Sequence, residues 1–283
     1  MYVQLWRRFQ SMGLADAHFV SDVVRGDEGK FWERIWEMLL AQHLIRQRHT
    51  LCSTNQGPDF KLEYNGQTIW IEAISPRPTG LPEDWLKLPE PGVPRVRSFP
   101  HEGILLRWTS AIKEKRDKLE GRRVSTSRSE KVAFGYRQNG HVGEMDSFVI
   151  AVNGSRLSLS RDDHGISQLP FAVEAVFPIG PIEISVNVET MEWGEAKTSF
   201  RPTLVKKSGA EVSTRAFLDP EFRGVSAVVG CNVSYDIDPL PIIVVHNPLA
   251  KNPVPKGIFG AAEEYYLEEA EGDFYRLLQF ENG

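Results

Sequence analysis

The sequence predicts a mixed α/β protein built on one central sheet. Three observations support this fold class: two segments carry apolar residues at helical spacing, two extended stretches are joined by Asn-Gly, and the second half is rich in short apolar runs. The expected order is helix, strand, hairpin, helix, strand and then mostly strands. We expect a single domain over residues 1–283, with a core of about 29–154. Residues 155–283 are interpreted as a β-rich elaboration of the sheet or a second lobe.

The first helix is predicted over residues 29–48. Its apolar stripe contains Phe31, Trp32, Ile35, Trp36, Leu39, Leu40 and Leu44. His43 falls inside this stripe, so we expect a core histidine rather than a ligand. Glu33 and Glu37 border the stripe one turn apart. A short strand is expected next, at Thr50–Ser53.

A hairpin is predicted over Asp59–Ile74, because Asn65-Gly66 suits a type I′ turn, in which both residues have positive φ. A two-residue turn pairs Tyr64 with Gln67, and the same register places Asp59 opposite Glu72. Their Cβ atoms are then roughly 5 Å apart, and facing carboxylates repel unless a cation lies between them. A solvated strand end is the alternative interpretation.

Glu72 lies within the otherwise apolar stretch "IWIEAI", on the same face as Trp70. A buried ionised carboxylate requires a partner, and residues of this kind are frequent at functional sites. The position of Glu72 therefore strengthens the prediction of a metal site beyond what the hairpin geometry alone provides.

Prolines exclude regular helix or central strand from residues 75–100. A second helix is predicted over residues 103–121, ending at Gly121. Its apolar face comprises Ile104, Trp108, Ala111, Ile112 and Leu119. Lys115 falls within this face, so it either extends to the helix edge or points toward the sheet and its acids.

Further strands are expected at "SFVIAVNG", "TLVKK", "VSAVVGCNVSY" and "PIIVVHNP". The type of the last two segments, "EEYYLEE" and "DFYRLLQF", is left open. His246-Asn247-Pro248 follows a predicted buried strand, and we interpret it as a structural turn in preference to a site element.

The composition is that of a globular protein, with 41% hydrophobic and 25% charged residues and a net charge of -5. No membrane span or signal peptide is recognised, and two distant cysteines fit a reduced, cytoplasmic location. Residues 113–137 are locally basic, with nine basic and four acidic side chains. This segment is either a solvated helix face with a loop or a patch that contacts phosphates. The candidate contacts are Lys113, Arg116, Lys118, Arg122 and Arg123.

Pro58-Asp59, the hairpin and Glu72 together resemble the PD-(D/E)XK nuclease superfamily, whose fold is restriction-endonuclease-like. The resemblance covers about residues 29–154 and rests on short, degenerate motifs. The chain also resembles a group of uncharacterised bacterial proteins through Trp36-Glu37, Pro58–Ala73, Ser110–Lys115 and His246-Asn247-Pro248.

The resemblance implies a restriction-endonuclease-like core, a central mixed sheet flanked by helices, and Mg²⁺-dependent (or Mn²⁺-dependent) hydrolysis of DNA. Asp59, Glu72 and a backbone carbonyl near residue 74 would hold the metal, with Glu37 as a further acid or third ligand. Solvated glutamates are the alternative for Glu33 and Glu37. Many enzymes of this fold act as dimers, so a homodimer is a further expectation, although no self-complementary surface is recognisable in the sequence.

The resemblance places a catalytic lysine at position 74, where this chain has Ile74. We therefore predict that Lys115 replaces it. The first functional hypothesis is a DNA nuclease of defence or of a mobile element. The alternative is a catalytically inactive nuclease-fold protein that binds nucleic acid or acts as a scaffold. Motifs of P-loop NTPases, zinc hydrolases and serine hydrolases do not occur.

Overall fold

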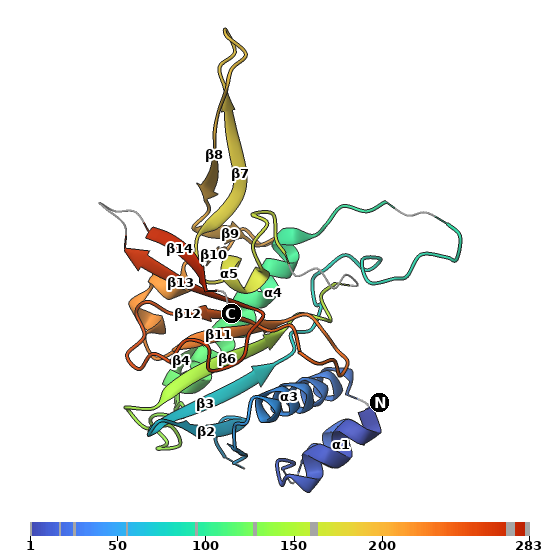
Figure 1. The fold of residues 1–283 in the computed structure, drawn as a ribbon, viewed down its shortest axis with the longest axis vertical. Coiled ribbons are helices and arrows are strands. Elements are labelled where there is room, and N and C mark those ends of the chain that lie inside the picture. The colour runs from blue at the N-terminus through green and yellow to red at the C-terminus, as the bar shows by residue number, and fades with distance from the viewer. Residues whose placement is uncertain are drawn as a thin grey trace.

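In the computed structural model, an eight-stranded mixed sheet runs through the molecule and helices cover both of its faces (Figure 1). The structure describes residues 2–16, 18–24, 27–54, 56–93, 96–126, 129–158, 164–269 and 275–280. The strand order is β1-β2-β3-β6-β11-β12-β13-β14, with β3/β6, β6/β11 and β12/β13 parallel. The predicted mixed α/β class with a central mixed sheet is therefore confirmed.

The strands of this sheet alternate their side chains between two buried clusters. They are β1 (Leu51–Cys52), β2 (Phe60–Tyr64), β3 (Gln67–Ile74), β6 (Ser147–Asn153), β11 (Ala227–Cys231), β12 (Ile243–His246), β13 (Glu263–Glu269) and β14 (Tyr275–Phe280). One cluster contains α1 (Tyr2–Ser11), α2 (Phe19–Val24) and α3 (Glu28–Arg46), and the other contains α4 (His101–Glu120) and α5 (Phe171–Glu174). In β3, Ile71 belongs to the first cluster, while Trp70 and Ile74 belong to the second. Glu72 therefore points toward α4.

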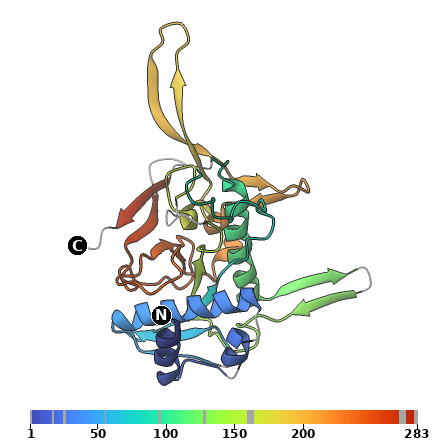
Figure 2. The ribbon, with the colours of Figure 1, turned by 90° about the vertical axis from the view of Figure 1, so that its right-hand side faces the viewer.

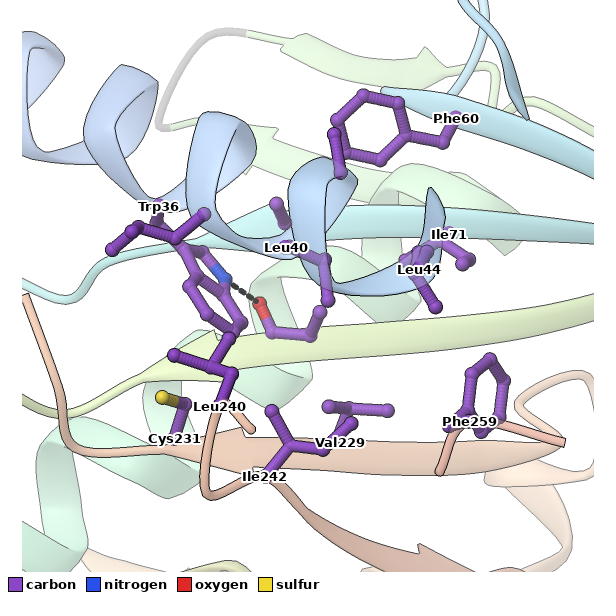
Figure 3. Close-up of a cluster of buried hydrophobic side chains, with 14 of the residues drawn as sticks. Trp36, Leu40, Leu44, Phe60, Ile71, Val229, Cys231, Leu240, Ile242 and Phe259 are labelled. Atoms are coloured by element: carbon purple, nitrogen blue, oxygen red, sulfur yellow. Dashed lines mark hydrogen bonds between the residues drawn. The ribbon is translucent and has the colours of Figure 1, made fainter. Parts of the chain in front are cut away.

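Helix α3 begins where Asp27 accepts a hydrogen bond from the Lys30 backbone N–H at 3.1 Å. Its middle is buried against the sheet, and Figure 3 shows the Trp36 indole N–H donating to the carbonyl of Ala151 at 2.9 Å. His43 is buried with Nε2 2.8 Å from the carbonyl of Phe259. The predicted helix and the core histidine are both confirmed.

The predicted hairpin forms with the predicted register. Asn65 has φ 50° and Gly66 φ 79°, as a type I′ turn requires. Tyr64 pairs with Gln67 and Phe60 pairs with Ile71, so the next position of the register brings residue 59 to the level of Glu72.

Helix α4 ends at Gly121, which has φ 76°. Residues 75–100 contain no helix or strand in the part of this segment that the structure describes. The two segments of open type are both strands, β13 and β14, and they pair with each other at the edge of the sheet. Four strands from the second half thus extend the same sheet.

Two hairpins project from the body (Figure 2). One consists of β4 (Arg122–Thr126) and β5 (Ser129–Ala133), within the basic segment, which becomes a hairpin after α4 ends. The other consists of β7 (Ile179–Val186) and β8 (Trp193–Phe200). A small hairpin, β9 (Thr203–Val205) and β10 (Glu211–Ser213), and two 3-10 turns, Ala216–Leu218 and Pro220–Phe222, lie between β8 and β11. Among the described helices, none has the length and apolar composition needed to cross a bilayer.

The Trp36 contact predicts a stability change. Trp36→Phe removes the donor to Ala151 in a dry core and should lower the free energy of unfolding by about 1–3 kcal/mol. Urea denaturation measures this change. Trp32→Phe, one turn earlier and only half-buried, is the control and should cost less. Equal costs would show that the hydrogen bond contributes nothing measurable.

Candidate active site

Glu72 is the centre of a buried network of charges. Its Oε1 accepts from the ammonium groups of Lys115 at 2.8 Å and Lys118 at 3.0 Å, and its Oε2 accepts from the Tyr136 hydroxyl at 3.1 Å. The Glu72 side chain is 3% exposed and that of Lys115 is 7% exposed, whereas that of Lys118 is 46% exposed. One buried carboxylate is thus satisfied by three donors from outside its own strand.

Local geometry explains why Lys115 reaches Glu72. The apolar face of α4 packs on the sheet, and Lys115 lies on that face, so its side chain points at β3. Ile74 shares a strand face with Glu72 and is buried in the cluster under α4. The resemblance expects a lysine at position 74 of the strand. In this chain, the ammonium group that contacts Glu72 comes instead from Lys115 on α4. Whether Lys115 has the catalytic role stays a prediction.

Asp59 lies beside Glu72, at the point where β2 begins. Its Oδ2 accepts from the backbone N–H of Ala73 at 2.7 Å, so a side chain continues the contacts between the two strands just before the first residue of β2. Asp59 as a whole residue is only partly buried, whereas Glu72 is buried. The two carboxylates therefore lie close enough for their charges to interact, where β2 begins and β3 nears its end, as the hairpin register predicts.

A second chain of charges approaches Asp59 from α3. Glu37 is buried and contacts Arg34 at 2.9 Å. Arg34 also contacts Asp22 at 2.7 Å and Asp16 at 3.2 Å. Glu33 pairs instead with Lys30 at 2.8 Å, nearer the surface.

Carboxyl groups outnumber cationic groups around this site. Within the described contacts, five carboxylates (Asp16, Asp22, Glu37, Asp59 and Glu72) share three cations, Arg34, Lys115 and Lys118. The crowding lies between Glu37 and Asp59 and between Asp59 and Glu72, where the charge of one carboxylate raises the pKa of its neighbour.

The pKa values reflect this crowding. Burial and the charge of Glu72 raise the pKa of Asp59 to about 7, against the opposing effects of Lys115 and the Ala73 N–H. Burial and Asp59 raise the pKa of Glu37 well above its usual range. Burial also acts to raise the pKa of Glu72, but Lys115 and Lys118 hold it below the usual value. Glu72 is therefore the ionised member of the group.

The two donors beside Glu72 keep their protons. Burial alone would lower the pKa of Lys115, but the charges of Glu72 and Asp59 raise it above its usual value. Burial and the same two carboxylates raise the pKa of Tyr136. At neutral pH, Lys115 is thus an ammonium ion and Tyr136 a neutral hydroxyl.

The basic candidates are distributed around α4 and the hairpin after it. Lys113 lies 3.4 Å from Asp117, while Arg116 contacts Asp117 at 3.3 Å and Glu221 at 2.9 Å. Lys118 contacts Glu72, and Arg122 is exposed at the base of β4. The side chain of Arg123, and Arg128 of the same segment, lie outside the described residues.

Sequence reasoning missed the part that Lys118 and Tyr136 take in the site. Lys118 lies on the flank of the apolar face of α4, so the periodicity that singled out Lys115 assigned Lys118 to solvent. It reaches Glu72 because it lies one turn after Lys115. Tyr136 comes from a segment read as loop, and no spacing rule links it to β3.

His246-Asn247-Pro248 has structural contacts. The Asn247 amide donates to the carbonyls of Phe222 at 2.9 Å and Val225 at 2.8 Å, and it accepts from the Leu249 N–H at 2.9 Å. His246 pairs with the buried Glu264. The interpretation as a structural turn agrees with these contacts.

Comparison of the chain with protein families, with curated proteins and with solved structures finds no match in any of the three. Across the described residues, no group of three or more His, Cys, Asp or Glu side chains is arranged to hold a metal ion.

The raised pKa of Asp59 predicts a pH-dependent stability. An ordinary carboxyl titrates near pH 4, whereas Asp59 in the folded protein titrates at about 7. The protonated Asp59 carboxyl therefore makes its full contribution to the free energy of unfolding below about pH 4, and this contribution is lost as the pH rises through 7. Asp59→Asn, which imitates the protonated form, should be more stable than the wild type by about 2–4 kcal/mol at pH 8, and by little at pH 4.

Denaturation of both proteins from pH 4 to pH 8 measures this difference. The exposed Glu83→Gln, in the proline-rich loop, gives the effect of neutralising a surface carboxyl. If Asp59→Asn is destabilised equally at every pH, the crowding of carboxylates around Asp59 has been wrongly inferred.

The pairing of Glu72 with Lys115 predicts a non-additive response to mutation. Glu72→Gln leaves Lys115 charged and buried and should cost about 3–5 kcal/mol. The double variant Glu72→Gln/Lys115→Met removes both charges and should cost less than Glu72→Gln alone. The exposed pair Lys30 and Glu33 is the control, and Glu33→Gln should cost no more than about 1 kcal/mol. Additive costs of the two site substitutions would contradict a direct interaction.

Proposed function

We propose that the protein is a metal-dependent nuclease that hydrolyses phosphodiester bonds in DNA. The observation that carries the proposal is the proximity of Asp59 and Glu72 where β2 begins and β3 nears its end, with the Lys115 ammonium group 2.8 Å from Glu72. Two acids and a lysine in contact form the residue set that phosphodiester hydrolysis with a divalent metal requires.

The residues fit Mg²⁺ or Mn²⁺. Mg²⁺ is usually held by one or two carboxylates, with water and substrate oxygens completing its coordination. Asp59 and Glu72 supply the two carboxylates, and Asp59 is only partly buried as a residue. The crowding of carboxyl groups and the raised pKa of Asp59 are both effects that a divalent cation would relieve.

In the proposed reaction, each side chain has a distinct part. When bound, Mg²⁺ supplies Lewis acidity toward a phosphoryl oxygen and an attacking water. Lys115 stabilises negative charge developing on the phosphoryl group, since its ammonium form is held by Glu72 and Asp59. Lys118 is partly exposed and can exchange its contact with Glu72 for one with a phosphate. Tyr136 orients Glu72 through its hydroxyl.

The arrangement of elements also supports a restriction-endonuclease-like core. Helix α3, strand β1, the hairpin β2–β3, helix α4 and strand β6 occur in this order, with the β4–β5 hairpin between α4 and β6, and β6 is parallel to β3. A central mixed sheet with helices on both faces is the architecture that the resemblance implies.

A second candidate function is binding of nucleic acid without catalysis. The observation that favours it is the closed set of contacts at Glu72, which Lys115, Lys118 and Tyr136 satisfy without a metal. Under this candidate, Lys115 has replaced the cation permanently and the site serves stability.

Cleavage and metal binding separate the two candidates. The nuclease should cut plasmid or single-stranded DNA in Mn²⁺, and calorimetry should detect Mn²⁺ binding. Asp59→Asn is expected to fold stably yet lose metal binding and cleavage, so its loss of activity cannot be attributed to unfolding. Lys115→Met should retain metal binding and cut about 100-fold more slowly, as expected for one lost charge-stabilising donor.

Lys30→Met is the matched control, because Lys30 also contacts a glutamate at 2.8 Å but is exposed. Its rate should equal that of the wild type. The absence of Mn²⁺ binding, or equal binding by Asp59→Asn, would refute the metal site. DNA binding without cleavage or metal binding would establish the second candidate.

A further inference from the structure

A pocket of about 580 Å³ opens directly beside the carboxylate site. It lies between α4 and the segment from Ala133 to His141. Two of its lining residues, Lys118 and Tyr136, are among the three that donate to Glu72. A molecule in this pocket would therefore contact the side chains that surround the proposed scissile phosphate.

Phe134 presents an aromatic ring at this pocket and is 68% exposed. Tyr136 and His141 also line it, with their rings edge to face and their centroids 6.4 Å apart. An aromatic ring left in water beside half-buried aromatic neighbours offers a flat apolar surface to a ligand.

The backbone that carries Phe134 is anchored to the end of α4. The Tyr136 N–H donates to the carbonyl of Lys118 at 2.8 Å, and the Gly135 N–H donates to the side chain of Gln138 at 2.6 Å. A Cβ at Gly135 would lie 2.2 Å from the backbone N of Gly121, so only glycine allows this close approach. The position of Phe134 at the pocket thus follows from fixed backbone contacts.

The charges around the pocket are balanced. Lys118 and Arg122 contribute positive charge, while Glu114 and Asp117 contribute negative charge. Phosphate attraction alone would be weak here, and a ligand must also use the aromatic surface. A nucleotide combines a planar base with a phosphate and fits both features. Bases within a duplex are stacked on each other, so only an unpaired base can lie on a side chain.

We propose that Phe134 is a stacking platform for an unpaired nucleobase adjacent to the bond that is cleaved. The preferred substrate is then single-stranded nucleic acid, or a strand with an unpaired nucleotide at the cleavage position. This inference rests on the proposed nuclease function, whose substrate class it specifies.

Binding of labelled oligonucleotides in EDTA tests the proposal without cleavage. Fluorescence anisotropy would compare a single-stranded 20-mer of DNA, the same sequence as RNA, and the DNA duplex. Phe134→Ala should weaken single-strand binding about tenfold, which is typical of one lost stacking contact, and change duplex binding less than twofold. Phe134→Trp should restore single-strand binding.

Val132→Ala is the matched control, since Val132 is an exposed apolar residue two positions away that does not line the pocket. It should bind every oligonucleotide as the wild type does. Equal losses in Phe134→Ala and Val132→Ala, equal losses for single strand and duplex, or no loss in Phe134→Ala would each overturn the proposal. Loss with DNA alone, RNA alone or both supports stacking and identifies the nucleic acid.

The outcome is separable from that of the nuclease proposal. Phe134-dependent binding of single strands with no cleavage in Mn²⁺ would retain the stacking platform and refute the nuclease. Cleavage that depends on Asp59 but is unchanged in Phe134→Ala on every substrate would retain the nuclease and refute the platform.

Discussion

The burial of one ionised carboxylate within an apolar strand is the constraint on which the site depends. Glu72 faces α4 because alternate residues of β3 belong to opposite cores. A buried charge is costly without a partner, so the opposing helix must supply one. Lys115 does so from the apolar face of α4. The ion pair therefore requires α4 to be rotated about its axis so that Lys115 faces the position of Glu72 on β3.

The same constraint extends to the segment that follows α4. Tyr136 donates its hydroxyl to the second oxygen of Glu72, and its backbone N–H donates to the carbonyl of Lys118 in the last turn of α4. Gly135 permits that segment to lie against Gly121 and Leu119. One carboxylate is thus linked to the sheet, to a helix and to the segment that forms the adjacent pocket. Because Lys118 and Tyr136 both contact Glu72 and line the pocket, a change at Glu72 should be transmitted to the pocket.

Much of this site was predictable because its geometry is local. The Asn65-Gly66 turn sets the register, and the register alone brings Asp59 to Glu72. The helical periodicity around Lys115 identified a lysine on an apolar face, and the carboxylate that it contacts across that face is Glu72. Both inferences use the spacing within one element together with the polarity of its neighbours.

Other parts were not predictable, because they depend on contacts between distant segments. Tyr136 lies 64 positions from Glu72 and belongs to no regular element, so no periodicity indicates its direction. The hairpin β7–β8 carries exposed apolar residues, Ile182, Ile184 and Val186. Its apolar residues therefore do not mark a buried face, and their spacing could not indicate where its two strands begin and end. Helix α1 depends on packing against α3, through contacts such as the edge-to-face pair of Tyr2 and Phe31.

The difference in exposure between the two lysines links the stability of the site to its proposed activity. Lys115 is buried, so releasing it from Glu72 would leave two charges unpaired in the core, and it should stay in place. Lys118 is largely in contact with water, so it can leave Glu72 at little cost. A cation bound between Asp59 and Glu72 would replace the charge of Lys118 and free it toward the pocket. The site could then accept a metal and a phosphate without losing the ion pair that holds α4 on the sheet.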